Sequence, residues 1–121
     1  MKKKKSLKSL KKKAWDLFSK YIRQRDKGVC ISCGKKDHWK NMQAGHFFHG
    51  SLNFDEQNVA AQCPRCNKWL HGNLANYAIA LTKLYGDGIL DELREKKNKV
   101  EKLSRGDLEE IIAKYKELVH E

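Results

Sequence analysis

Four cysteines in two Cys-x-x-Cys pairs are the residues with the clearest chemistry in this chain. Cys30 and Cys33 form one pair, and Cys63 and Cys66 form the other. The two-residue spacing lets both thiolates of a pair reach one ion, and four thiolates complete a tetrahedral zinc site. Because sulfur would fill every position, no water could bind this zinc. We therefore predict one structural zinc ion per chain, rather than four unrelated buried thiols.

A histidine and two asparagines lie where they could serve hydrolysis. His46 stands in the stretch that the zinc would enclose, and an imidazole can take a proton from water near neutral pH. Asn58 could orient that imidazole or pin the facing loop. The amide oxygen of Asn67 is a hard ligand for magnesium or manganese, which would stabilise the charge on a scissile phosphate. This set predicts metal-dependent phosphodiester hydrolysis.

Each of these residues also has a purely structural interpretation. The histidine could be packed or at the surface, and the asparagines could cap a turn and a helix. His71 follows Asn67 by four residues and would share its helical face, so it is a candidate second magnesium ligand, as is His49. Both histidines could equally be surface residues. Trp39 and Trp69 are expected to pack in the core or hairpin rather than to stack on bases.

Length and charge restrict the class of protein. The chain has 121 residues, enough for one domain, and a formal net charge of +11. Such an excess points to a polyanionic partner, nucleic acid first and anionic membrane second. No apolar run approaches the ~18 residues of a membrane span, and none follows the N-terminal lysines as a signal peptide would require. We therefore expect a cytoplasmic protein with no membrane partner, where paired cysteines more often hold metal than form disulfides.

Hydrophobic periodicity predicts an α+β protein. Apolar residues at three- and four-residue steps indicate amphipathic helices near both termini. Their apolar faces could form a dimer contact or complete the core of one chain. A strand is expected over residues 41–48, an extended segment up to Gln62, a helix from Pro64 that carries Asn67 to His71, and a capping box at Ser104. Further helices are predicted over 74–85 and 89–96.

The predicted organisation is a basic arm and one domain. Residues 1–13 form a lysine-rich arm that merges into the first helix, and residues 14–121 form the domain. Within it, about 28–73 should hold the zinc and the core of the site, and 74–121 should be helical.

Six short motifs follow one another along the chain: Cys30-x-x-Cys33, Gln43-Ala44-Gly45-His46-Phe47, Phe54-Asp55-Glu56-x-Asn58, Gln62-Cys63-x-x-Cys66-Asn67, Gly72-Asn73 and Tyr77. This succession resembles the phage NinG/Rap recombination proteins, from about Lys11 through the C-terminal helix. It is also similar to the HNH (His-Me finger) nucleases, whose ββα-metal core surrounds one divalent ion. Its Cys-x-x-Cys-Asn ending is similar to phage endonuclease VII, a junction resolvase.

The resemblance implies a zinc-stapled ββα-metal core flanked by N- and C-terminal helices, and an endonuclease for branched DNA such as Holliday junctions. His46 would be the base, Asn58 the supporting asparagine and Asn67 the third motif position. Gly45 departs from the pattern, because many relatives place a metal-binding aspartate or histidine before the base. One magnesium ligand is then unassigned, with His49, His71, Asn73 or water as candidates. The near two-fold symmetry of a junction favours a homodimer.

Basic residues indicate where DNA would lie, since lysine and arginine contacts to phosphate give affinity that does not depend on the base sequence. Arg65 and Lys68 flank the candidate metal ligand and are the first choice. The other candidates are Lys35, Lys36, Lys40, Arg23, Arg25 and the lysine arm. Two alternatives stay open: a non-catalytic zinc-finger nucleic-acid-binding protein, and an HNH nicking enzyme without junction preference. Catalysis requires that His46 and Asn67 face one ion-sized gap.

Overall fold

The protein is an α+β structure built from a two-stranded antiparallel sheet and helices. The computed structural model describes residues 5–50, 52–99 and 102–120. The elements in chain order are α1 (Leu7–Arg25), the 3-10 turn η1 (Trp39–Asn41), β1 (Gln43–His46), β2 (Val59–Gln62), the π-helical turn η2 (Arg65–Trp69), α2 (Leu74–Tyr85), α3 (Ile89–Lys99) and α4 (Arg105–Leu118). The mixed class predicted from the sequence is confirmed.

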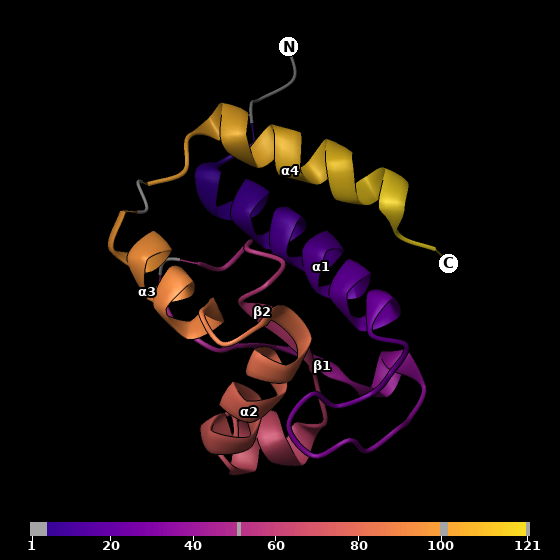
Figure 1. The fold of residues 1–121 in the computed structure, drawn as a ribbon. Coiled ribbons are helices and arrows are strands. Elements are labelled where there is room, and N and C mark those ends of the chain that lie inside the picture. Colours follow the sequence, from indigo (N-terminus) through magenta and orange to yellow (C-terminus); the bar gives the residue numbers. More distant parts are fainter. Residues whose placement is uncertain (1–4, 51, 100–101, 121) are drawn as a thin grey trace.

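The two terminal helices pack against each other along their length (Figure 1). Leu10, Ala14, Phe18 and Ile22 recur every four residues on α1, and all four are buried. Helix α4 starts at the predicted capping box and buries Leu108 and Tyr115. Of the two uses left open for these apolar faces, the structure shows the second, because they complete the core of a single chain.

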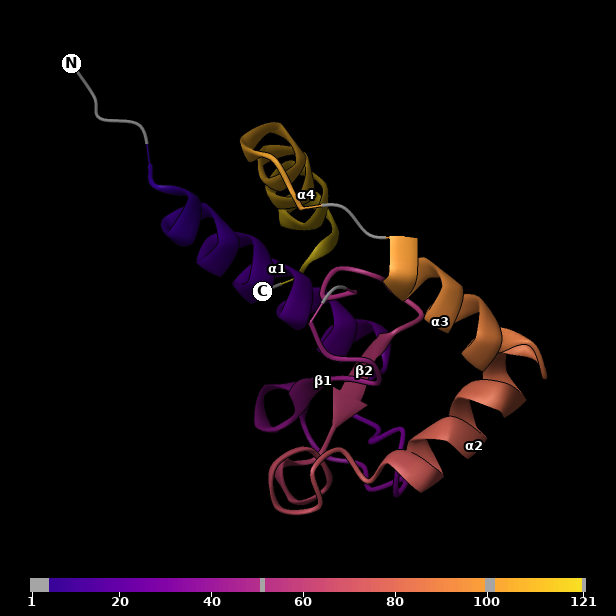
Figure 2. The same ribbon diagram turned by 90° about the vertical axis from the view of Figure 1, so that its left-hand side faces the viewer.

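The β-hairpin lies between α1 on one face and α2 on the other (Figure 2). Gln43 pairs with Gln62, and His46, the last residue of β1, pairs with Val59. Side chains alternate between the faces of a strand. Val59 therefore packs on Phe18 of α1, whereas Ala60 packs on the α2 side, where Tyr77, Leu81 and the α3 residues Ile89 and Leu93 form a second core cluster.

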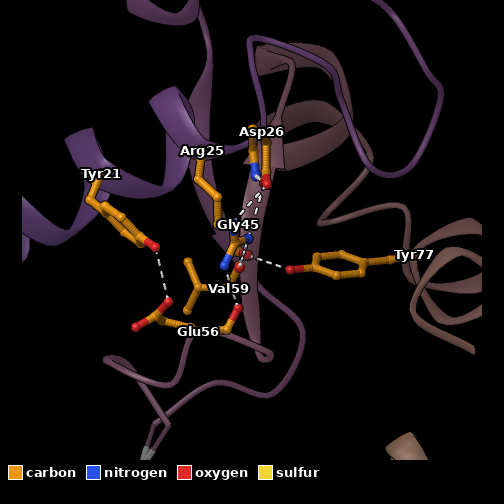
Figure 3. A network of polar contacts seen from close by, with 8 residues as sticks. Tyr21, Arg25, Asp26, Gly45, Glu56, Val59 and Tyr77 are labelled. Carbon is orange, nitrogen blue, oxygen red and sulfur yellow. Dashed lines mark hydrogen bonds and ion pairs between the residues drawn. The ribbon is translucent and has the colours of Figure 1, made fainter. Parts of the chain in front are cut away.

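A polar network joins the end of α1 to β2 (Figure 3). The guanidinium of Arg25 donates to the backbone oxygens of Glu56 at 2.7 Å and Val59 at 3.0 Å, and it pairs with Asp26 at 2.8 Å. Asp26 in turn accepts the Ala61 backbone N–H at 2.8 Å. From the α2 side, the Tyr77 hydroxyl donates to the Gly45 carbonyl at 2.7 Å. The hairpin is thus held from both faces, and the guanidinium of Arg25, one of the candidates for DNA contact, is engaged in this network.

The segment after the second cysteine pair differs from the prediction. The expected helix to His71 is wrong: a π-helical turn ends at Trp69, and His71, Gly72 and Asn73 all have positive φ before α2 begins. This left-handed run reverses the chain. Trp69 is 77 % exposed, so its expected place in the core is also wrong.

The lysine-rich stretch is helical from Leu7 onward, so Lys8 and Lys11 to Lys13 lie on α1. The arm's residues 1–4 lie outside the described residues. Within residues 5–50, 52–99 and 102–120, no helix combines the length and apolar character needed to cross a membrane.

Candidate metal centre and active site

The four cysteines converge at one point, as their spacing predicts. Their Sγ atoms all lie within 4.8 Å of one another, and those of Cys33 and Cys63 are 3.7 Å apart. Zn–S bonds of about 2.3 Å in a tetrahedron require sulfurs at this separation, so the set could hold a zinc ion. Cys30, Cys63 and Cys66 are buried and Cys33 is exposed. The cluster joins the loop before β1 to the end of β2.

Local backbone geometry prepares the thiols for a metal. The Cys30 backbone N–H donates to the Lys35 carbonyl, and the Gly34 N–H donates to the Cys30 carbonyl, each at 2.8 Å, which closes a tight knuckle around the first pair. Burial would raise the pKa of Cys63, but the Cys66 backbone N–H and the neighbouring thiols hold it down at about 7. Burial and the neighbouring thiols raise the pKa of Cys66 to about 12, so Cys63 ionises more readily than Cys66.

His46 faces α1 at the end of the hairpin. Its ring stacks on Trp15, with centroids 4.8 Å apart and planes at 17°, and its Nε2 is buried without a hydrogen-bond partner. Burial, together with a smaller effect of charge repulsion from the His49 ring 5.6 Å away, lowers the pKa of His46 to about 4. The imidazole is therefore neutral at pH 7, the form that can accept a proton.

A cavity of about 810 Å³ opens beside His46. Lys11, Lys12 and Lys102 border it together with Trp15, and among the described lining residues Asp55 is the one carboxylate. The sequence predicted Lys11 and Lys12 only as part of the basic arm, and it did not predict Lys102 as a residue of the site. Three ammonium groups around one neutral imidazole suit a phosphate-bearing ligand.

Asn58 is buried and holds the loop beyond β1. Its Oδ1 accepts the Phe48 backbone N–H at 2.9 Å, and its Nδ2 donates to the Phe48 and Leu52 carbonyls, each at 3.0 Å. Of the two roles considered for Asn58, the structure shows the pinning of the facing loop.

Asn67 lies on the other face of β1, next to Gly45. Its Nδ2 donates to Gln43 Oε1 at 2.8 Å. A Cβ at Gly45 would lie 1.8 Å from Gln62 Oε1 and 2.9 Å from Asn67 Oδ1. Gln62 Oε1 therefore fills the space that a side chain at position 45 would take, and Asn67 Oδ1 borders it.

Gln62 is a site residue that the sequence analysis missed. Its Nε2 donates to Ser32 Oγ at 2.8 Å and to the Gly72 carbonyl at 2.6 Å, which fixes the amide orientation because a carbonyl needs a donor. Its Oε1 is buried without a partner. The sequence did contain a signal for Gln62, because it is the one polar residue in the otherwise apolar strand Val59–Gln62.

His46 and Asn67 do not face one gap, which corrects the sequence-based expectation. Gly45 and His46 are neighbours on β1, so their side-chain directions point to opposite faces. Asn67 borders the Gly45 side, whereas the His46 ring stacks on Trp15 of α1.

The other candidate magnesium ligands each have different surroundings. His71 is outside the helix with φ of 50°, so the expected shared helical face does not exist. His49 sits beside His46. Asn73 Nδ2 donates to Cys66 Sγ at 3.6 Å, which makes it a partner of the cysteine cluster.

Five of the cations expected to contact DNA are exposed: Arg65, Lys68, Lys35, Lys36 and Lys40. Lys40 lies over the Trp39 ring at 5.7 Å, beside Arg23 at 5.3 Å. These positions are open to a polyanion.

Fold and site together define a small α+β protein organised around a four-cysteine cluster that could bind zinc. A family model described as "Bacteriophage Lambda NinG protein" matches residues 1–121. The chain belongs to the NinG family.

Curated relatives agree with this assignment. Over 113 residues the chain is 33% identical to "Protein ninG" of Salmonella phage P22, covering 88% of this chain and 54% of that protein. Over 95 residues it is 34% identical to the Escherichia phage lambda protein of the same name, covering 73% and 45%. The chain thus spans about half the length of the curated relatives it matches. No solved structure matches it.

Proposed function

We propose that this chain is a metal-dependent endonuclease that acts on branched DNA, with an HNH-type ββα-metal core. The supporting observation is His46, an unpartnered imidazole in a lysine-bordered cavity at the end of a hairpin joined to the cysteine cluster. His46 takes the proton from the attacking water, and the lysines bind the phosphodiester backbone. The preference for Holliday junctions and a homodimeric assembly rest on the resemblance to junction resolvases.

The divalent ion, magnesium or manganese, would be held by Asn67 Oδ1 and Gln62 Oε1. A buried amide oxygen without a donor is a site that a cation can satisfy, and oxygen ligands suit magnesium. Gln62 then supplies the ligand that Gly45 does not. Bound there, the ion would stabilise charge on the phosphate and the leaving oxygen. Because His46 and Asn67 do not share one gap, cleavage would require the scissile phosphate itself to cross the end of β1, with Asn67 and Gln62 on one face and His46 on the other.

His46→Ala tests the assignment. We expect cleavage of a four-way junction with magnesium to fall by about 100-fold or more, because general-base catalysis contributes that much. Zinc content and DNA affinity should stay unchanged. His120→Ala is the matched control, since His120 is an exposed histidine on the last described residues. Because the pKa of His46 is about 4, wild-type cleavage should persist at about pH 5.5, where an ordinary imidazole is mostly protonated.

The placement of His46 and Asn67 on opposite faces of β1 favours a second candidate, a non-catalytic zinc-stapled DNA-binding protein. It predicts junction binding without magnesium-dependent cleavage of any substrate by the wild type. Equal cutting of junction and linear duplex at fixed salt would instead indicate a nicking enzyme without junction preference.

A further inference from the structure

Trp69 is the most exposed large hydrophobic side chain among the described residues, at 77 %. It lies in η2 at the end of the molecule opposite α4 (Figures 1 and 2). Leu70, the next residue, and Leu74 are also exposed, at 44 % and 42 %. An indole in water forgoes the free energy that burial of its large apolar area would give, so a surface of this kind commonly meets a partner.

The backbone holds Trp69 outward. Within η2 and the following turn, the Leu70 N–H donates to the Arg65 carbonyl at 2.9 Å, and the Gly72 N–H donates to the Cys66 carbonyl at 2.7 Å. Cys66 belongs to the cysteine cluster, so metal binding would fix the same turn. The indole is thus presented on a preorganised turn, which lowers the entropy cost of binding.

Charge around Trp69 identifies the partner. Arg65 and Lys68 are exposed on the same turn, and no aspartate or glutamate stands between Glu56 and Asp87. The carboxylates of an acidic protein surface would meet the cations but would not stack on the indole. Nucleic acid offers both phosphates and base faces, and aromatic side chains flanked by cations are how proteins bind unstacked bases.

We propose that Trp69 stacks on an unpaired or unstacked DNA base while Arg65 and Lys68 bind the adjacent phosphates. The inference rests on DNA as the partner in the proposed function and names the feature of branched DNA that this surface recognises, which is an accessible base face.

The test compares Trp69→Ala and Trp69→Phe on two DNAs of equal length, a fully paired duplex and a fork with unpaired bases at the branch. Binding is measured at fixed salt without magnesium, so that no cleavage occurs. Trp69→Ala should weaken fork binding by about tenfold and duplex binding little, whereas Trp69→Phe should keep most of the fork affinity. A 2-aminopurine at the branch should be quenched by the wild type and not by Trp69→Ala.

Lys68→Ala serves as the control. It should weaken binding to the fork and to the duplex alike, and it should reduce the salt dependence of binding by about one counterion. Zinc content and circular dichroism establish that each variant is folded. Equal fork binding by Trp69→Ala and the wild type overturns the inference, as does self-association of the wild type that this variant abolishes. If Trp69→Ala loses fork binding and the wild type cleaves no DNA, the inference about Trp69 holds and the proposed nuclease activity is rejected.

Discussion

At the scale of single residues, the site consists of polar groups whose partners come from distant parts of the chain. Trp15 faces His46, and Ser32 and Gly72 hold the Gln62 amide. These contacts leave one nitrogen on His46 and one oxygen on Gln62 without a partner. A buried polar group without a partner costs free energy, so each of these two atoms marks a position kept for binding or chemistry rather than for stability. The two positions lie on opposite faces of β1.

Gly45 is required by the Gln62 side chain. In Gly45→Ala the new methyl would lie 1.8 Å from the buried Gln62 Oε1, so the amide must move and strain its two hydrogen bonds. We expect the free energy of unfolding to fall by about 1–3 kcal/mol, as overpacking does elsewhere. Urea unfolding measures it.

Gly106→Ala is the matched control, because its nearest neighbour would be 3.8 Å away within helix α4. It should raise stability by up to about 1 kcal/mol, since alanine favours a helix. Equal effects of the two substitutions would show that the contact at Gly45 does not constrain the hairpin.

At the scale of elements, Arg25 and Asp26 fasten the end of α1 to β2. Arg25→Met keeps the aliphatic length but removes the donors to the Glu56 and Val59 carbonyls. The unfolding free energy should fall by about 1.5–3 kcal/mol, the value of hydrogen bonds to charged groups. Thermal or urea unfolding provides the measurement.

The comparison for that variant is Arg94→Met, whose exposed pair with Asp91 should contribute less than about 1 kcal/mol. If both arginine variants are equally stable, the Arg25 network is not what holds α1 on the hairpin.

The element order was largely readable from the sequence, and the exception has a local cause. Periodicity and caps predict α1, α2 and α4, because these signals act between residues a few positions apart. Around Asn67 the chain must place Cys63 and Cys66 in the cluster and then reverse through His71, Gly72 and Asn73. That geometry ends the predicted helix after one π-helical turn.

At the scale of the whole molecule, the cysteine cluster joins two segments that are otherwise held by a short hairpin. We expect purified protein to carry one zinc per chain, and a strong chelator to lower the midpoint of thermal unfolding. A loss of about 2 kcal/mol would shift it by roughly 10 °C in a domain of this size. Calorimetry with and without chelator measures the shift.

Cys33→Ser combined with Cys63→Ser should start at the lower midpoint and respond no further to the chelator. Zinc-free wild-type protein with an unchanged midpoint would mean that the cysteines do not hold a structural metal.

Sequence alone determined the local features: the metal-ligand spacing of the cysteines, the amphipathic terminal helices, the Ser104 capping box and the motifs shared with the NinG family. Tertiary structure decided which face of β1 each group occupies, that Gln62 fills the space at Gly45, and that Trp69 is exposed. The reason is physical. Spacing and periodicity are properties of a few consecutive residues, whereas burial and partner choice depend on which distant segments pack together.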